Sequence, residues 1–302
     1  MRLAVAATPD VALPTLEWLF SSEHELVLII TQPDRPAGRG RISSPSVIAQ
    51  WAQAHEIAVI KPETAKDLIG KIEDLDLVLT IGYGVLLPEI VLNLPKFGFI
   101  NLHFSLLPAY RGAAPAQRAL ENGETRTGVT VFQLDKGMDT GPIYTQSSLT
   151  IQASWRSTEL LANLSELGVD AVVRAILLMA TNTPPVPQTG VGSTAAKITK
   201  NEAKISFAEN ADLVIRRIKA FTYEPGAWTL WKGEVFKITR AIQCDDVIGK
   251  SGQIFTEKSA LRVACGDSTG IKILEVIPSG KKEMLAIDWA RGARLNGGEY
   301  FG

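Results

Sequence analysis

The N-terminal half of the chain alternates between short apolar runs and segments of helical spacing, and this alternation restricts the fold more than any other feature. The helical spacing is clearest at Val11–Phe20. The apolar runs lie at Leu3–Ala7, Glu25–Thr31, Ile57–Ile60, Leu75–Ile81 and Gly98–Leu102. Strands that are apolar along their length and separated by helices predict a parallel sheet covered on both faces. Ligands of such sheets bind beyond the carboxyl ends of the strands.

The C-terminal part follows a different pattern. A long helix is predicted from Ser157, as its N-cap, towards Ala180, and a Pro/Gly-rich stretch follows at 183–193. A helix at Asn210–Phe221 then leads into short alternating segments with turn residues between them: Ala227–Trp231, Val235–Ile238 and Leu261–Ala264. Such segments are typical of a small β-barrel.

Composition and charge narrow the class of protein. The 302 residues suggest two domains, and the 46% of hydrophobic residues can fill a sizeable core. The net charge of −1 excludes nucleic-acid binding by overall charge, so any such contact needs local patches. Residues 206–302 hold 14 Lys and Arg against 12 Asp and Glu, a net charge of +2 that leaves −3 for the remainder. This asymmetry favours the C-terminal part as the anion-facing one.

The sequence carries no signal for a metal or a nucleotide cofactor. The turn Ala6–Asp10 lacks the glycine-rich dinucleotide fingerprint, so NAD binding is not expected. Cys244 and Cys265 fit neither a metal spacing nor a disulfide framework, and we expect both to be reduced and buried. The first residues carry no signal-peptide pattern, and no apolar run approaches the roughly 20 residues that span a membrane. We therefore expect a cytoplasmic protein without membrane contact.

The densest signal for chemistry is the segment Gly98–Pro108. Asn101 and His103 stand two residues apart at the end of a predicted strand, so their side chains share one face. Asp139 follows a second predicted strand, Gly128–Leu134. An amide and an imidazolium can donate to an oxyanion, and a carboxylate can hold the imidazole charged. No Ser or Cys stands in a nucleophile setting nearby, which favours direct transfer through a tetrahedral intermediate.

Each of these residues also has a structural interpretation. Taken alone, Asn101 is more often a turn residue at a strand end, and His103 a half-buried histidine with satisfied hydrogen bonds. Asp139 alone, in a glycine-rich loop, is more often a turn residue. The spacing by itself is weak support for a catalytic site.

The sequence resembles the methionyl-tRNA formyltransferases along nearly its whole length. The matching stretches are Thr31–Gly40, Tyr83–Pro88, Asn101–Pro108, Arg111–Pro115 and Asp139–Gly141. Folate-dependent formyltransferases in general share the pattern of Asn, His, Ser-Leu-Leu-Pro and Asp. The Pro-Asp-Arg-Pro-Ala-Gly-Arg-Gly loop and the C-terminal domain look specific to the tRNA enzymes. Ala7 and the turn Thr222–Trp228 depart from the family's usual residues.

The resemblance implies roles for individual residues. Asn101 and His103 would stabilise the formyl oxyanion, and Asp139 would fix His103 and assist proton movement. The folate pocket would be lined by the segments Gly84–Leu87, Ser105–Pro108 and Leu134–Asp139. The residues singled out in them are Gly84, Val85, Leu87, Ser105, Leu106, Leu107, Pro108 and Leu134. A flat pterin needs backbone donors and acceptors between apolar walls, and these segments can supply both.

The resemblance also implies contacts with tRNA. The loop Gln32–Ser46 is rich in Pro, Gly and Arg, and alone it would be taken for a solvated surface loop. With the resemblance, Arg35, Arg39 and Arg41 would meet the acceptor stem. Lys200 and Lys204 could track phosphates, although a solvated face is the simpler interpretation of any single lysine. Trp228 and Trp231 are expected in the barrel core rather than stacked on bases.

Together these observations predict an α/β fold with a Rossmann-like N-terminal parallel sheet and a smaller OB-like C-terminal β-barrel. The predicted domains are a catalytic domain at 1–182, a linker at 183–205 and a tRNA-binding domain at 206–302. The expected activity is formyl transfer from 10-formyltetrahydrofolate to initiator methionyl-tRNA, without a metal, by a monomer. The alternatives are another folate-dependent formyltransferase, a formyltetrahydrofolate hydrolase, or a non-catalytic tRNA-binding protein on this scaffold.

Overall fold

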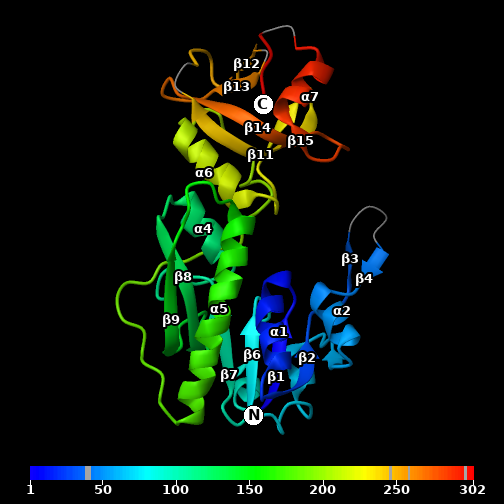
Figure 1. The fold of residues 1–302 in the computed structure, drawn as a ribbon, viewed down its shortest axis with the longest axis vertical. Helices are drawn as coiled ribbons and strands as arrows, with labels where there is room; N and C mark the ends of the chain where they lie inside the picture. The colour runs from blue at the N-terminus through cyan, green and yellow to red at the C-terminus, as the bar shows by residue number, and fades with distance from the viewer. Residues whose placement is uncertain (38–41, 245–246, 258, 296–297) are drawn as a thin grey trace. The chain divides into compact units, whose positions relative to one another are not determined.

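The computed structural model describes residues 1–37, 42–244, 247–257, 259–295 and 298–302 (Figure 1). Its contacts divide the chain into two compact units. The first comprises Met1–Pro115, Arg126–Thr150 and Leu161–Ala196, and the second comprises Ala116–Thr125, Ile151–Leu160 and Lys197–Gly302. Each unit is described by itself.

The first unit is built on a seven-stranded sheet in the order β5-β2-β1-β6-β7-β8-β9. The strands are β1 (Arg2–Ala7), β2 (Glu25–Ile30), β5 (Ala58–Ile60), β6 (Leu77–Ile81), β7 (Phe99–His103), β8 (Arg126–Gln133) and β9 (Ile143–Thr150). The five strands from β5 to β7 are parallel. The carboxyl ends of β6 and β7 therefore meet at one edge of the sheet, where a ligand site is expected.

The last two strands differ from the expected parallel pattern, because β8 is antiparallel to β7 and β9 is antiparallel to β8. A parallel neighbour would need a crossover that returns the chain to the amino end of the sheet. Here the chain leaves the carboxyl end of β7 and re-enters beside it, since His103 pairs with Thr130 and Ile100 with Gln133. As a result β8 ends at Gln133 near the start of β7, and its continuation must run back along the sheet.

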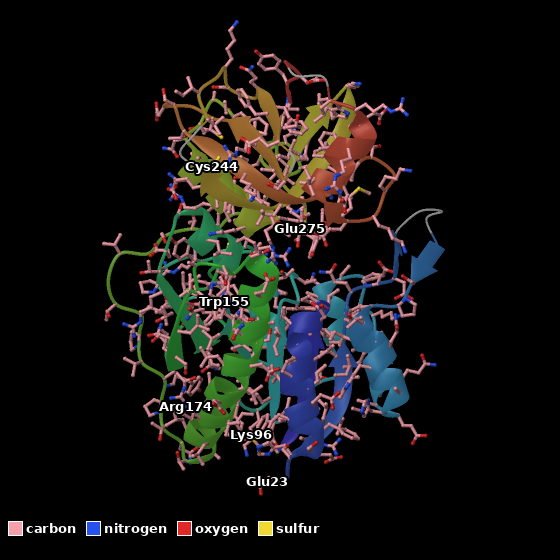
Figure 2. The ribbon with its side chains drawn as sticks, turned by 45° about the horizontal axis from the view of Figure 1, so that its top comes forward. Glu23, Lys96, Trp155, Arg174, Cys244 and Glu275 are labelled. Atoms are coloured by element: carbon pink, nitrogen blue, oxygen red, sulfur yellow. The ribbon has the colours of Figure 1, made fainter. Side chains whose placement is uncertain are left out.

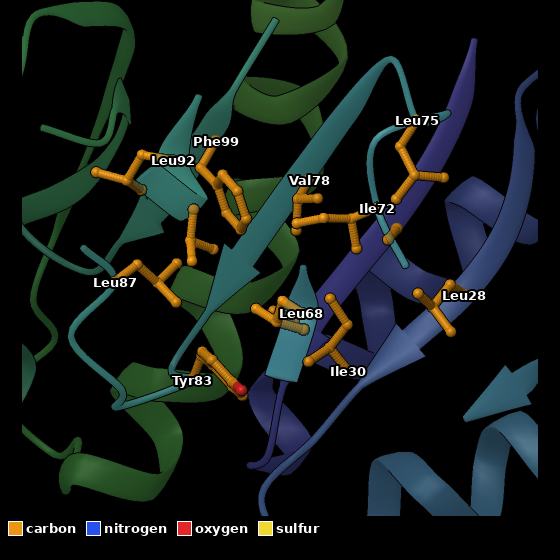
Figure 3. Close-up of a cluster of buried hydrophobic side chains, with 13 residues drawn as sticks. Leu28, Ile30, Leu68, Ile72, Leu75, Val78, Tyr83, Leu87, Leu92 and Phe99 are labelled. Atoms are coloured by element: carbon orange, nitrogen blue, oxygen red, sulfur yellow. The ribbon is translucent and has the colours of Figure 1, made fainter. Parts of the chain in front are cut away.

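One face of the sheet is covered by an apolar cluster (Figure 3). The strands contribute residues two apart, such as Leu28 and Ile30, which project to the same side. The segment between β5 and β7 supplies the cover, with Leu68, Ile72 and Leu92 fully or nearly fully buried. Its helical parts are η2 (Ala65–Leu68) and α3 (Glu89–Leu92). Strand β2 also contacts α1 (Leu13–Ser21, preceded by η1 at Asp10–Ala12) and α2 (Val47–Ala54), neither of which contributes to this cluster.

Helix α5 (Ser157–Ala180) packs closely on the sheet. A Cβ at Gly168 would lie 2.6 Å from the Leu102 side chain on β7, so the absence of a side chain permits this approach. Arg174 on the same helix donates to the Ser147 hydroxyl on β9 (Figure 2). Ser157 is the first helical residue rather than the N-cap, and its hydroxyl donates to the Thr222 carbonyl. The predicted N-cap role of Ser157 was therefore wrong.

The predicted loop at Gln32–Ser46 contains a short antiparallel hairpin of β3 (Arg35–Ala37) and β4 (Ile42–Ser44). It follows the carboxyl end of β2, at the same edge of the sheet as the ends of β6 and β7. Arg35 begins β3, whereas Arg39 and Arg41 lie outside the described residues. Beyond this segment, Ser46 caps α2 by accepting a hydrogen bond from the Ala49 amide at 3.1 Å.

The second unit contains an antiparallel sheet in the order β10-β11-β14-β13-β12, with β15 paired to β14. Its strands are β10 (Trp228–Trp231), β11 (Glu234–Cys244), β12 (Ile254–Glu257), β13 (Ala260–Ala264), β14 (Gly270–Ile277) and β15 (Met284–Leu285). Its helices are α6 (Ala211–Phe221), α7 (Ala286–Ala293) and most of α4 (Pro115–Glu121). Asn210 caps α6 by accepting from the Leu213 amide at 2.9 Å. Trp231 packs edge-on against Trp289, at 5.2 Å between ring centroids. Trp228 and Trp231 are only partly buried, so the prediction that both lie in the core was wrong.

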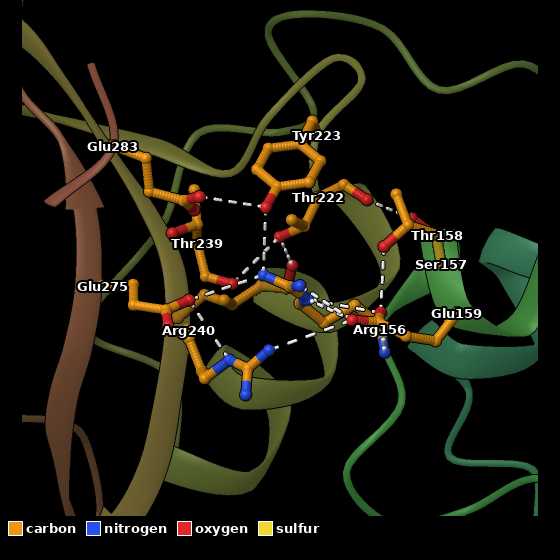
Figure 4. Close-up of polar contacts among 11 residues, drawn as sticks. Arg156, Ser157, Thr158, Glu159, Thr222, Tyr223, Thr239, Arg240, Glu275 and Glu283 are labelled. Atoms are coloured by element: carbon orange, nitrogen blue, oxygen red, sulfur yellow. Dashed lines mark hydrogen bonds and ion pairs between the residues drawn. The ribbon is translucent and has the colours of Figure 1, made fainter. Parts of the chain in front are cut away.

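A charged cluster lies within the second unit around Arg156 (Figure 4). Its guanidinium donates to Glu159 at 2.7 Å and lies 3.6 Å from Glu275. Burial raises the pKa of Glu159, but hydrogen bonds from Arg156 and Thr158 outweigh this effect and lower it to about 2. The cluster joins the segment before α5 to strand β14.

The predicted fold class is confirmed: a Rossmann-like sheet carries the first unit, and an antiparallel sheet carries the second. Free Cys265 is buried as expected, and burial raises its pKa to about 12, whereas Cys244 is only partly buried. Among the described residues, no helix is both long and apolar enough to span a bilayer.

Candidate active site

A cavity of about 400 Å³ opens at the carboxyl edge of the first unit's sheet. Four segments form it: the end of β6 with the loop after it, the end of β7, the residues 112–115 that lead into α4, and the loop after β8. The lining residues include Thr80, Tyr83, Gly84, Val85, Leu86, Leu87, Asn101, His103, Gly112, Leu134, Met138 and Asp139. The cavity therefore brings together all three residues predicted to be catalytic.

The Asn101 side chain is oriented by its neighbour on β6. The Thr80 hydroxyl lies 2.8 Å from the Asn101 Oδ1 atom and donates to it. Because Oδ1 is occupied on that side, the Nδ2 donors point away from Thr80. Asn101 lines the cavity, so these donors are available to an oxyanion formed there.

His103 is held from one side by the main chain. Its Nε2 atom lies 2.9 Å from the Tyr110 carbonyl oxygen, and a carbonyl can only accept, so Nε2 carries the proton. The neutral ring then presents an unprotonated Nδ1 atom. That atom faces the Asp139 Oδ2 atom at 3.7 Å. Nδ1 is thus the nitrogen that can gain and lose a proton.

Burial and charge act in opposite directions on the pKa of His103. Burial lowers the pKa of the imidazole below its ordinary value, and the Asp139 carboxylate and the Tyr110 carbonyl oppose this effect only in part. The side chain is 6% exposed, so the loss of hydration is severe. This direction favours a neutral imidazole near pH 7, and the charged state expected from the sequence stays a prediction.

Asp139 occupies a constrained backbone position. Its φ of 54° lies in the left-handed region, which asparagine and aspartate tolerate better than most residues. Its Oδ2 atom accepts a hydrogen bond from the Gly112 amide at 2.7 Å. A Cβ at Gly112 would lie 2.8 Å from the Ala195 carbonyl oxygen, and its φ of 124° is also positive. Glycine is therefore required at the position that anchors the carboxylate.

The predicted folate residues divide into two groups. Gly84, Val85, Leu87 and Leu134 line the cavity, whereas Ser105, Leu106, Leu107 and Pro108 are outside the lining found among the described residues. The Ser105 hydroxyl instead donates to the Ala109 carbonyl at 2.6 Å. This bond closes the turn just before Tyr110, whose carbonyl contacts His103. Direct folate contact by Ser105–Pro108 stays a prediction.

Leu86 and Met138 lie in the segments predicted to line the pocket, and both line the cavity although they are 74% and 65% exposed. Sequence reasoning missed two parts of the site. The Tyr110 carbonyl and the Gly112 amide act through the main chain, so their side chains gave no signal.

The lysines predicted to contact tRNA lie in the second unit and are exposed. The Lys204 ammonium lies 5.7 Å from the centroid of the Trp228 ring. The Lys200 carbonyl accepts from the Trp228 indole nitrogen at 2.7 Å. This indole contact fixes the segment that carries both lysines. Within the described part of the chain, no group of three or more His, Cys, Asp or Glu residues could hold a metal ion.

The geometry defines a class of protein: an α/β protein with an amide donor and an imidazole–carboxylate pair in one cavity at the carboxyl edge of its sheet, as acyl transfer requires. The model of the formyl transferase family matches residues 1–176, and the model of its C-terminal domain matches residues 197–294. Proteins named methionyl-tRNA formyltransferase are 40% identical in Salinispora tropica and 41% identical in Thermobifida fusca, covering 99% and 100% of this chain and 99% of each relative. The chain belongs to the methionyl-tRNA formyltransferase family.

Solved structures share the fold. An N-formyltransferase from Helicobacter canadensis, in complex with folinic acid and dTDP-3-aminofucose, matches with a TM-score of 0.69 and 21% identity. The match covers 90% of this chain and 98% of that protein. A methionyl-tRNA formyltransferase from Clostridium thermocellum matches with a TM-score of 0.56 and 16% identity, over 88% of this chain and all of that one.

Proposed function

We propose that this chain transfers a formyl group from 10-formyltetrahydrofolate to the α-amino group of initiator methionyl-tRNA. The observation that carries the proposal is the cavity that Asn101, His103 and Asp139 all line, in a chain about 40% identical to methionyl-tRNA formyltransferases over its full length. The residues 1–182 would form the catalytic domain, 183–205 the linker and 206–302 the tRNA-binding domain.

The cavity suits a flat heterocycle. Apolar side chains of Val85, Leu87, Leu134 and Met138 can contact its faces, while main-chain groups of the same loops can meet its polar edge. The reacting carbon would then lie near Asn101 and His103, at the inner end of these loops. The residues present thus fit a folate-derived donor.

The chemistry follows from the hydrogen-bond donors and acceptors that line the cavity. The attacking amine forms a bond to the formyl carbon, and the carbonyl oxygen becomes an oxyanion to which Asn101 Nδ2 donates. His103 Nδ1 accepts the proton that the amine loses, and the resulting imidazolium is stabilised by Asp139 at 3.7 Å. His103 then returns this proton to the departing nitrogen as its bond to carbon breaks. The proton taken from the amine is the one given to the departing nitrogen, so the reaction needs no external acid or base.

Asp139 has a proton-coupled role in this scheme. Its carboxylate raises the pKa of an imidazole that burial lowers. The two effects keep the base neutral at rest and still allow it to be protonated during the reaction, which suits a general base near neutral pH. The α-amine, with a reference pKa of roughly 8, is partly neutral under the same conditions.

The test is transfer of labelled formyl from 10-formyltetrahydrofolate, with initiator methionyl-tRNA, free methionine and a dTDP-amino sugar as separate acceptors. We expect rapid labelling of the tRNA alone. Preferential labelling of the amino sugar would assign a sugar-nucleotide acceptor. Release of free formate without transfer would assign a hydrolase, and binding of tRNA without either reaction would assign a non-catalytic protein.

A further inference from the structure

The segment 183–196, which follows α5 in the first unit, contacts the loops that carry the active site. At one end Val186 exchanges two backbone hydrogen bonds with Ile143, at 2.7 and 2.8 Å. At the other end Ser193 accepts from the Arg111 amide at 2.8 Å, and the Ala195 amide donates to the Arg111 carbonyl at 2.6 Å. Gln188 lies between these two anchored ends.

The Gln188 carboxamide uses both of its ends in hydrogen bonds. Its Nε2 atom donates to the Asp139 carbonyl at 2.8 Å and to the Gly141 carbonyl at 2.9 Å. Its Oε1 atom accepts from the Arg111 guanidinium at 2.7 Å from Nη2 and 3.3 Å from Nε. This set of partners fixes which end of the amide faces the catalytic loop.

Arg111 and Gly112 therefore hold Asp139 at its main chain and at its carboxylate. The Gly112 amide binds its carboxylate directly at 2.7 Å. Arg111, the preceding residue, acts on its main chain through Gln188. Asp139 has a positive φ of 54°, a conformation that its surroundings must maintain. Release of its carbonyl would let the backbone relax and carry the carboxylate away from His103.

We propose that Gln188 is a positioning residue for catalysis, which acts through Asp139 to set the distance between that carboxylate and His103 Nδ1. This inference rests on the proposed formyl transfer for its kinetic readout. Gln188 does not line the cavity found in the described structure, so its effect is on rate and on the His103 pKa rather than on folate binding. Its partner Arg111 fixes the amide orientation and shares the role.

The first experiment compares Gln188→Leu and Gln188→Glu with the parent. Both remove the N–H donors to the two carbonyls, and the glutamate also keeps an oxygen for Arg111. We expect kcat to fall about tenfold to a hundredfold in both, the size associated with a displacement of about 1 Å in a catalytic group. KM for either substrate should change by less than about threefold. Val191→Ser is the matched control in the same segment, since Val191 is 96% exposed.

A double-mutant cycle separates positioning from a general loss of structure. If Gln188 acts through Asp139, the double variant Asp139→Asn with Gln188→Leu should be as slow as Asp139→Asn alone, because coupled residues are not additive. Losses that multiply would overturn the proposal, as would an unchanged kcat in both Gln188 variants. Arg111→Lys provides a second route if a Gln188 variant does not fold, since it keeps the charge but loses the two-nitrogen contact. A kcat equal to that of the parent in this variant would remove Arg111 from the proposed role.

A measurement on the free protein keeps this test independent of the proposed function. The Asp139 carboxylate raises the pKa of His103, so its displacement in Gln188→Leu should lower that pKa. Ring resonances of the three histidines can be titrated by NMR, and His103→Asn assigns the signal. An unchanged His103 pKa in Gln188→Leu would reject positioning even in an active enzyme. A parent that transfers no formyl group but shows the shift would reject the proposed function and retain the Gln188–Asp139 relationship.

Discussion

The Nδ1 atom of His103 lies 3.7 Å from the Oδ2 atom of Asp139, beyond hydrogen-bond distance, while that same oxygen accepts a short hydrogen bond from the Gly112 amide at 2.7 Å. The carboxylate is thus anchored to the main chain and not to the imidazole. A neutral histidine has no Nδ1 proton to offer when Nε2 donates to Tyr110. A hydrogen bond between His103 Nδ1 and Asp139 Oδ2 can form only when Nδ1 gains a proton. We therefore expect this bond to form when His103 accepts the proton of the attacking amine.

The first prediction concerns the oxyanion donor. Asn101→Asp keeps the oxygen that accepts from Thr80 but replaces the Nδ2 donors with a second oxygen. We expect kcat to fall by about a hundredfold or more, the usual loss for an oxyanion donor. The dissociation constant for a folate analogue, measured by titration calorimetry, should stay within a few-fold. Asn93→Asp, on an exposed residue after α3, makes the same change elsewhere; equal activity in the two variants would remove Asn101 from the mechanism.

The second prediction concerns pH. Burial lowers the pKa of His103, so the imidazole should titrate below its ordinary value of 6.5 in the free protein. Asp139 raises that pKa, so Asp139→Asn should lower it further and move the acidic limb of kcat to lower pH, with a large loss of rate on the plateau. NMR titration measures the pKa of His103, and single-turnover rates of formyl transfer at different pH values locate the acidic limb of the profile. A His103 pKa above 6.5, or an upward shift in Asp139→Asn, contradicts the assignment.

The sequence predicted which residues line the cavity at the end of the sheet, but not the effect of burial on them. The strand-end positions of Asn101 and His103 follow from the two-residue period of a strand, and the parallel order of β1, β2, β6 and β7 follows from their apolar runs. The lowered pKa of His103 is caused by burial among residues far apart in the chain, and no local sequence pattern records such burial. The antiparallel return of β8 depends on where the chain re-enters the sheet. The contacts of Gln188 lie in a stretch that its Pro/Gly content marked only as a linker.

The third prediction concerns the cluster around Arg156. Arg156→Met leaves Glu159 and Glu275 without their least exposed partner. Both carboxylates are partly exposed to solvent, which screens the loss, so we expect a cost of about 1 kcal/mol. The Glu159 pKa is lowered to about 2, so this carboxylate stabilises the fold fully above its ordinary pKa of 4.5 and loses that contribution as pH falls toward 2. Calorimetry should therefore show a gap between parent and variant at pH 7 that narrows below pH 4.5.

The control for this cluster is Arg291→Met, whose side chain is 68% exposed and pairs with Asp288. It should shift the midpoint of unfolding very little, because exposed ion pairs contribute about 0–1 kcal/mol. A gap for Arg156→Met that stays constant from pH 7 to pH 3 would show that packing, and not charge, accounts for its effect.

The last prediction concerns the acceptor. Arg35, Arg39 and Arg41 were predicted to bind tRNA from a loop that follows β2 at the ligand edge, and Lys200 and Lys204 from exposed positions in the second unit. If these cations neutralise phosphates, kcat/KM for methionyl-tRNA should fall as salt rises, with a logarithmic slope of about 0.7–0.9 per phosphate contacted. The double variants Arg39→Ala with Arg41→Ala, and Lys200→Ala with Lys204→Ala, should each lower kcat/KM and reduce this slope by about one to two. The folate dissociation constant should not change.

The matched control is Lys71→Ala with Lys96→Ala, which removes the same charge from exposed residues that precede β6 and β7, at the edge of the sheet opposite the cavity. Net charge alone would make all three double variants respond equally to salt, because long-range attraction depends on total charge. If the contacts with phosphates are specific, the control should show the same salt dependence of kcat/KM as the parent. The other two double variants should show a lower kcat/KM and a smaller slope. If the control and the loop variants coincide, the predicted cations do not contact the tRNA, and its recognition must use other residues. If kcat/KM of the parent does not depend on salt at all, a polyanionic acceptor is excluded and a small amine becomes the acceptor to test.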